Sequence, residues 1–165
     1  MKNLILVRHA KSSWEYDVRD FDRPLKSRGK NDAITVAERF KTSGLLPDLI
    51  MTSGANRAKT TAELFNKTLK IPNDRFVVTN ELYDFSGGAV MHAITSCDNA
   101  VTTLMVFGHN HALTYLANSL GDRGIDNVPT SGLVSIAFNV DNWQDINTNT
   151  GKTMLTLFPK DIRTP

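Results

Sequence analysis

The sequence predicts an α/β fold, a three-layer α/β/α sandwich built around a mostly parallel sheet. Short apolar runs typical of buried strands alternate with segments whose apolar residues recur at helical spacing through most of the chain. The last two strand-like runs, residues 133–139 and 153–158, follow one another without a helical pattern between them. That succession favours an antiparallel pair at one edge of the sheet.

Length, composition and charge are those of a single globular domain spanning residues 1–165. A chain of this length can bury roughly 70% of its unfolded surface, and 41% hydrophobic with 22% charged residues is ordinary. The net charge of +2, from 19 basic and 17 acidic residues, gives no reason to expect a nucleic-acid or membrane partner. The lone Cys97 allows no intramolecular disulfide and favours a cytoplasmic location. Arg8 interrupts the N-terminal apolar run too early for a signal peptide.

The first strand is expected at Leu4–Val7, where four apolar residues stand in a row with β-branched Ile5 and Val7. After a long charged connection, the next helix is expected at 27–43, with Ser27 as its N-cap and Gly44 just past its end. Further strands are expected at 48–52, 76–79, 101–107, 133–139 and 153–158. Further helices are expected from the 53–57 turn to about residue 70, at 89–96 and at 110–120.

Unusual polar residues stand at three of these strand ends: Arg8-His9, the segment 53–57 with Arg57, and Gly108-His109. Parallel strands bring their carboxyl ends to one edge of the sheet, which is where open α/β sheets bind ligands. Arginine presents a fixed fork of donors that suits phosphate, and neutral histidine offers a nucleophilic nitrogen. The pattern predicts one site for phosphoryl chemistry.

These same segments carry a family resemblance. Leu-Val-Arg-His-Ala at 6–10, Ser-Gly-Ala-Asn-Arg-Ala-Lys-Thr-Thr at 53–61 and Phe-Gly-His-Asn at 107–110 resemble the histidine phosphatase superfamily, which includes phosphoglycerate mutases. The short chain and the segment 22–29 look most like the SixA-type phosphohistidine phosphatases. The resemblance implies a phosphoglycerate mutase-like fold.

The resemblance also implies roles for the predicted site residues. His9 would be the nucleophile that becomes a phosphohistidine, Arg8 and Arg57 would hold the phosphoryl oxygens, and His109 would donate a further hydrogen bond to them. Phosphoryl transfer needs positive charge on those oxygens and an in-line nucleophile. Two neighbouring guanidiniums should lower the pKa of His9 and keep it neutral.

A proton donor is harder to assign. Glu81 stands in the loop where superfamily members with alcohol leaving groups carry a glutamate, but its spacing to Gly87 departs from their pattern. Asp84 is the competing candidate, and Glu81 can equally be a solvated loop carboxylate. Because a P–N bond is labile, phosphohistidine can be cleaved without a strong acid.

The short stretch between Glu81 and His109 leaves no room for a roof over the site, so we expect a shallow, open pocket with Trp14 a candidate for its mouth. This favours hydrolysis of phosphohistidine on a protein. The alternatives are a broad-specificity phosphomonoesterase acting on small phosphate esters, then a mutase, and, outside enzymes, a phosphoryl-binding module without turnover. We expect no cofactor and no metal, because His111 should lie in a helix start away from the strand that carries His109.

Overall fold

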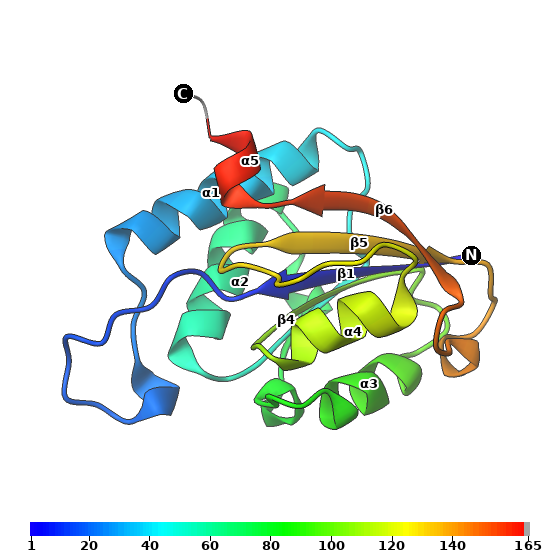
Figure 1. Ribbon diagram of the computed structural model, residues 1–165, viewed down its shortest axis with the longest axis horizontal. Helices are drawn as coiled ribbons and strands as arrows, with labels where there is room; N and C mark the ends of the chain where they lie inside the picture. The colour runs from blue at the N-terminus through cyan, green and yellow to red at the C-terminus, as the bar shows by residue number, and fades with distance from the viewer. Residues whose placement is uncertain (164–165) are drawn as a thin grey trace.

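The computed structural model describes residues 1–163 and shows one six-stranded sheet with strand order β3-β2-β4-β1-β5-β6 (Figure 1). The strands are β1 (Lys2–Arg8), β2 (Leu49–Thr52), β3 (Phe76–Val78), β4 (Thr103–Gly108), β5 (Leu133–Phe138) and β6 (Gly151–Leu157). The helices are α1 (Ser27–Lys41), α2 (Asn56–Leu69), α3 (Gly88–Thr95), α4 (Ala112–Leu120) and the short α5 (Pro159–Ile162). The predicted α/β class is confirmed.

The sheet is parallel on one side and antiparallel on the other. β1 pairs in parallel with β4, and β2 pairs in parallel with both β4 and β3. β5 runs antiparallel to β1, and β6 runs antiparallel to β5. The antiparallel edge predicted for the last two strands is therefore confirmed, and β1 forms the boundary between the two halves.

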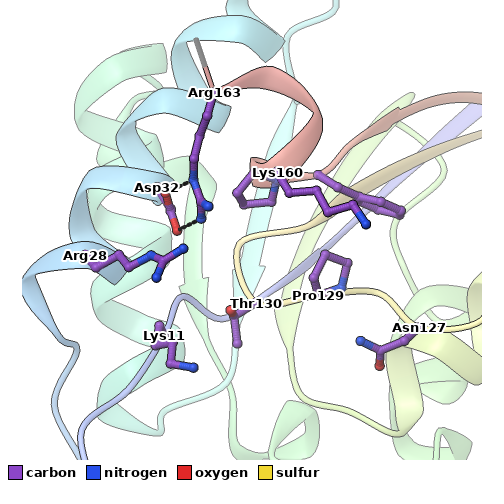
Figure 2. A pocket seen from close by; sticks show the side chains of 10 residues that line it. Lys11, Arg28, Asp32, Asn127, Pro129, Thr130, Lys160 and Arg163 are labelled. Carbon is purple, nitrogen blue, oxygen red and sulfur yellow. Dashed lines mark hydrogen bonds and ion pairs between the residues drawn. The ribbon is translucent and has the colours of Figure 1, made fainter. Parts of the chain in front are cut away.

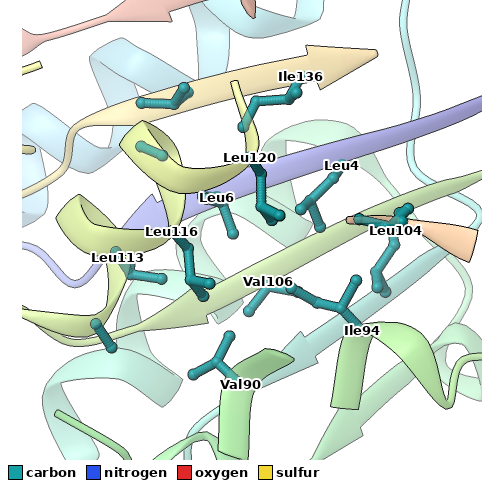
Figure 3. Close-up of a cluster of buried hydrophobic side chains, with 14 of the residues drawn as sticks. Leu4, Leu6, Val90, Ile94, Leu104, Val106, Leu113, Leu116, Leu120 and Ile136 are labelled. Carbon is teal, nitrogen blue, oxygen red and sulfur yellow. The ribbon is translucent and has the colours of Figure 1, made fainter. Parts of the chain in front are cut away.

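Helices cover both faces of the sheet, as Figure 1 shows for α1 and α2 on one side and α3 and α4 on the other. Successive residues of β1 point to opposite faces. Leu4 and Leu6 pack in the cluster that contains α3 and α4, which Figure 3 shows from close by. Ile5 and Val7 pack in the cluster that contains α1 and α2. β1 is thus buried on both sides, which explains its uninterrupted apolar sequence.

Several predicted boundaries move by one to three residues. Ser27 is the first residue of α1 rather than its N-cap, and Lys26 takes the cap position without a side-chain hydrogen bond. Gly44 has φ +78°, a left-handed conformation that glycine adopts freely, and it reverses the chain two residues after the C-cap. The predicted helix at 110–120 begins at Ala112. The four-residue helix α5 was not predicted, because a single turn has too few residues to show a period. Within residues 1–163, no helix is long and apolar enough to cross a membrane.

Candidate active site

The three polar strand ends meet at one edge of the sheet, as predicted. Arg8 lies beside Gly108 in the β1–β4 register, and Thr52 lies beside Phe107 in the β2–β4 register. The residues that follow these strands surround a cavity of ≈ 260 Å³. Its lining comprises Arg8, His9, Lys11, Ser12, Trp14, Arg23, Arg57, Phe85, His109, Asn110 and Thr130.

His9 is held from both its backbone and its ring. Its backbone N–H donates to the carbonyl oxygen of Gly108 at 3.1 Å. The ring Nδ1 lies 2.8 Å from the carbonyl oxygen of Ala10. A carbonyl oxygen only accepts hydrogen bonds, so Nδ1 carries the proton and Nε2 keeps its lone pair. Ala10, which stands where glycine is common in the superfamily, is not among the residues with positive φ, so its methyl group costs no backbone strain here.

Both site histidines are neutral at physiological pH. Burial is the largest cause that lowers the pKa of His9 to about 3, with smaller contributions from His109, Arg57 and Arg8, while the hydrogen bond to Ala10 acts in the opposite direction. Burial likewise lowers the pKa of His109 to about 3, followed by the charge of Arg57. The predicted direction of the His9 pKa is confirmed, and the two guanidiniums contribute to it. Their contribution is smaller than that of burial, which removes the ring from water.

Arg8 and Arg57 are anchored by different neighbours. Arg8 Nη1 donates to the carbonyl oxygen of Val128 at 3.0 Å. Arg57 donates to Asp20 twice, from Nη1 to the carbonyl oxygen at 2.7 Å and from Nη2 to Oδ2 at 3.0 Å. Burial and then the charge of Arg57 lower the pKa of Arg8. The two guanidinium groups repel each other, so an anion bound between them would offset this electrostatic repulsion.

Three of the four predicted side chains also carry a buried polar atom without a partner. Within residues 1–163, Arg8 Nε, Arg57 Nε and His109 Nδ1 are buried and make no hydrogen bond. Buried polar atoms in folded proteins almost always have a partner, and exceptions need an explanation. Phosphoryl oxygens accept hydrogen bonds and would provide partners for donors at this site.

Asp20 holds Arg57 in place and was not identified from the sequence. Its Oδ2 also accepts a hydrogen bond from the Tyr83 hydroxyl at 2.6 Å, and its Oδ1 accepts from Arg23 at 3.2 Å. Burial alone would raise the pKa of Asp20, but the hydrogen bonds from Tyr83 and Arg57 outweigh it and lower that pKa to about 2. Asp20 is therefore ionised and positions Arg57. In sequence it is one of many charges in the 11–27 connection, and nothing there distinguishes it.

Ser53 orients His109 in a similar way. Its Oγ lies 2.9 Å from His109 Nε2 and accepts a hydrogen bond from the backbone N–H of Ala55 at 3.1 Å. The sequence placed Ser53 in the turn after β2 but gave no indication of this contact, which joins residues 56 positions apart. The contact leaves Nδ1 as the free ring nitrogen of His109.

The structure does not bring Glu81 or Asp84 into the cavity lining. Glu81 Oε1 lies 3.3 Å from His92 Nδ1. His92 lies on α3 and is exposed. Asp84 accepts hydrogen bonds from the backbone N–H groups of Gly87, Ala89 and Val90 at 3.0–3.1 Å, so it caps the start of α3. The proton-donor role of either carboxylate stays a prediction.

Aromatic and loop residues complete the rim. Trp14 lines the cavity, as expected, and its ring lies over the Arg23 guanidinium at 3.2 Å from the ring centroid. His111 takes the N-cap position of α4 and is exposed, which agrees with the expected helix start. Within residues 1–163, no group of three or more His, Cys, Asp or Glu side chains is placed to hold a metal ion.

Comparison with known proteins identifies the family. Residues 4–95 match the family model of the histidine phosphatase superfamily, branch 1. The chain belongs to this superfamily. An uncharacterised chloroplastic protein of Arabidopsis thaliana is 31% identical over 157 residues, covering 87% of this chain and 70% of its own. An uncharacterised protein of Mycobacterium tuberculosis is 29% identical over 150 residues, covering 85% of this chain and 91% of its own.

Solved structures of the superfamily share the fold. The protein histidine phosphatase SixA, solved with tungstate, superposes with a TM-score of 0.82 at 20% identity, covering 98% of this chain and 99% of SixA. A putative SixA of Agrobacterium tumefaciens gives a TM-score of 0.76 at 24% identity, covering 94% and 97%. The phosphoglycerate mutase-like fold is therefore confirmed over nearly the whole chain, and superfamily membership supports phosphatase activity.

Proposed function

We propose that this protein hydrolyses phosphohistidine on a protein, through a phosphohistidine intermediate on His9. The observation that carries the proposal is the His9 ring. Its protonated Nδ1 is bound to a carbonyl oxygen, which leaves Nε2 with its lone pair, and His9 lines a cavity together with Arg8, Arg57 and His109. An unprotonated nitrogen beside fixed cationic donors is the arrangement that phosphoryl transfer requires.

In the first step, His9 Nε2 attacks phosphorus and the P–N bond of the substrate breaks. Arg8, Arg57 and His109 would bind the oxygens on which negative charge is carried. A substrate imidazole that carries a proton on its second nitrogen leaves as neutral imidazole, with the electron pair of the broken bond on the released nitrogen. In the second step, water attacks the phosphorus of the phosphorylated His9 and the P–Nε2 bond breaks. The electron pair of that bond returns to Nε2, and the protons of the water leave with the inorganic phosphate or to solvent.

Two features of the cavity favour this substrate over an alkyl phosphate ester. None of the described residues that line the cavity carries a carboxylate. An alkoxide leaving group needs a general acid, whereas a protonated imidazole does not. The volume of ≈ 260 Å³ is also below the roughly 300–1,000 Å³ of sites that enclose small molecules. It suits a phosphorylated side chain presented by another protein.

A broad-specificity phosphomonoesterase is the second candidate. The same four residues would support it, with Glu81 or Asp84 supplying the proton after a movement of the 81–88 loop. A phosphoryl-binding module without turnover is the third candidate, although the intact set of two arginines and two histidines argues for chemistry. A cytoplasmic location and independence of metal stay predictions.

The test measures the rate of phosphate release from three phosphoryl donors by wild type and by His9→Gln. Each rate is measured with and without EDTA. The donors are a phosphohistidine protein, p-nitrophenyl phosphate and phosphoserine. We expect wild type to prefer the phosphohistidine protein and to leave phosphoserine almost untouched. We expect it to cleave p-nitrophenyl phosphate more slowly than the phosphohistidine protein but measurably, because the nitrophenolate leaving group needs no general acid. We expect a phosphoenzyme that is labile in acid and stable in base, absent from His9→Gln, and turnover that survives EDTA.

Other outcomes would point elsewhere. Comparable rates on phosphoserine and phosphohistidine would support the phosphomonoesterase and would make Glu81→Gln the next variant. Phosphate binding without turnover of any donor would support the binding module. A phosphoenzyme that persists in His9→Gln would rule out His9 as the nucleophile.

A further inference from the structure

We call the cavity lined by Arg8, His9, Arg57 and His109 the phosphoryl cavity. A second hollow adjoins it and shares Lys11 and Thr130 with it. Its volume is ≈ 410 Å³. Figure 2 shows it between the start of α1, the loop before β5 and α5. We call it the basic groove and define it by Lys11, Arg28, Asp32, Asn127, Pro129, Thr130, Phe158, Pro159, Lys160 and Arg163.

The basic groove carries more positive than negative charge. It contains four cationic side chains and one carboxylate. The carboxylate of Asp32 is bound by Arg163 at 2.7 and 3.2 Å. Within residues 1–163, Lys11, Arg28 and Lys160 are exposed and make no ion pair. The local excess of three positive charges exceeds the net charge of +2 carried by the whole chain.

These three free cations come from different parts of the fold and end around the same hollow (Figure 2). Lys11 follows β1, Arg28 lies in the first turn of α1, and Lys160 lies on α5. Between them, Pro129, Phe158 and Pro159 contribute apolar surface, and Asn127 and Thr130 contribute polar surface. A groove that combines three free cations with apolar surface fits a chain that carries carboxylates interspersed with apolar side chains.

We propose that the basic groove binds an acidic segment of the substrate protein that flanks the phosphohistidine. This inference rests on the proposed function, because the two sites share a wall and one partner would occupy both. The groove differs from the phosphoryl cavity in a way that favours a peptide over a small anion. Apart from Ser131, the buried polar atoms without partners lie on phosphoryl-cavity residues and none lies on a groove residue. Its exposed cations therefore suit a mobile, extended ligand.

The test uses a pair of phosphohistidine peptides that differ only in carrying glutamate or glutamine at four flanking positions. We expect wild type at low salt to show a KM about tenfold lower for the glutamate peptide, with similar kcat. The double variant Arg28→Glu/Lys160→Glu should lose this preference. It should keep wild-type turnover of p-nitrophenyl phosphate, because both substitutions lie outside the phosphoryl cavity.

The control is Lys30→Glu/Lys152→Glu, which makes the same change in net charge at exposed positions outside both sites. It should keep the preference for the glutamate peptide. Raising the NaCl concentration to about 0.5 M should reduce the wild-type preference to about twofold or less, because exposed charges are screened. Equal KM values for the two peptides in wild type, or an equal loss in the control, would overturn the inference while leaving the proposed function intact.

A binding measurement separates failure of the groove from failure of the proposed function. The unphosphorylated glutamate peptide, fluorescently labelled, should bind wild type in an anisotropy titration and bind Arg28→Glu/Lys160→Glu about tenfold more weakly. If neither phosphohistidine peptide is hydrolysed but this difference in binding is found, the groove is an acidic-peptide site and the proposed function is wrong. If binding is the same in both proteins, the groove inference is wrong.

Discussion

At the residue scale, the two site histidines are neutral because the fold removes them from water. His9 is 8% exposed and His109 is 1% exposed. The pKa of each is lowered to about 3, mainly by burial. An unfolded chain exposes both rings, and their pKa then returns to about 6.5. At a pH between the native pKa and the unfolded pKa, the unfolded state binds protons that the native state does not. Acid therefore favours unfolding.

We therefore predict that the free energy of unfolding falls as the pH is lowered from about 7 to 5. Each histidine should contribute up to about 1.4 kcal/mol per pH unit over this range. Urea unfolding at pH 7, 6 and 5 measures the slope in wild type, His9→Gln and His109→Gln. Each single variant should show a shallower slope than wild type. A slope that neither substitution changes would show that other groups cause the acid sensitivity.

Arg57 illustrates a residue whose shape matters as much as its charge. One nitrogen of its guanidinium binds the Asp20 carbonyl oxygen and the other binds the carboxylate, which fixes the plane of the group. We expect Arg57→Lys to lower kcat/KM on phosphohistidine protein about 100-fold, and Arg57→Ala to lower it further, because an ammonium is a point charge. The control is Arg19→Lys, because Arg19 is an exposed arginine that forms an ion pair with Asp22 in the connection that carries Asp20. This variant should stay within about twofold of wild type.

At the element scale, the long connection between β1 and α1 is ordered by contacts along its own length. Ser13 N–H donates to the carbonyl oxygen of Pro24 at 2.8 Å, and Lys26 N–H donates to that of Lys11 at 2.9 Å. α1 then packs directly on this loop at Gly29. A Cβ atom at Gly29 would lie 2.4 Å from the Lys11 carbonyl oxygen and 2.8 Å from its backbone nitrogen. The glycine allows the helix to approach a residue that lines both the cavity and the groove.

Gly29→Ala should therefore lower the free energy of unfolding by about 1–3 kcal/mol and reduce kcat/KM, because Lys11 and the site wall must shift. Gly88→Ala provides the matched control, since a Cβ at the first position of α3 meets no atom within 4 Å. The control should change stability by about 1 kcal/mol or less, in the stabilising direction. Chemical denaturation and the phosphatase assay on both variants check this. Equal effects of the two substitutions would contradict the expected clash between a Cβ atom at position 29 and the Lys11 backbone.

At the scale of the whole molecule, one sheet connects the two hydrophobic cores. Leu4 and Leu6 of β1 belong to the core under α3 and α4, while Ile5 and Val7 belong to the core under α1 and α2. Both sets of side chains depend on the same backbone and the same strand pairs. Loss of either core would remove the support of the other, so we expect residues 1–165 to unfold as one cooperative domain.

Coincident unfolding curves would confirm this expectation. Trp143 is fully buried in the first core, whereas Trp14 is 75% exposed. In Trp14→Phe, fluorescence therefore reports only Trp143, and far-UV circular dichroism reports the helices on both faces. Urea midpoints from the two probes should agree. Two separated transitions would show that the two cores unfold independently.

The sequence by itself determined the fold class, the buried character of β1 and the meeting of Arg8, His9, Arg57 and His109. These features follow from local patterns, because a buried strand must be apolar and parallel strands end at the same edge. It did not reveal the anchoring of Arg57 by Asp20 or the basic groove beside Lys11. Both join residues from distant parts of the chain, and such contacts leave no periodic signal in the sequence. Only the tertiary structure, which sets how loops and helices pack over the strand ends, decided them.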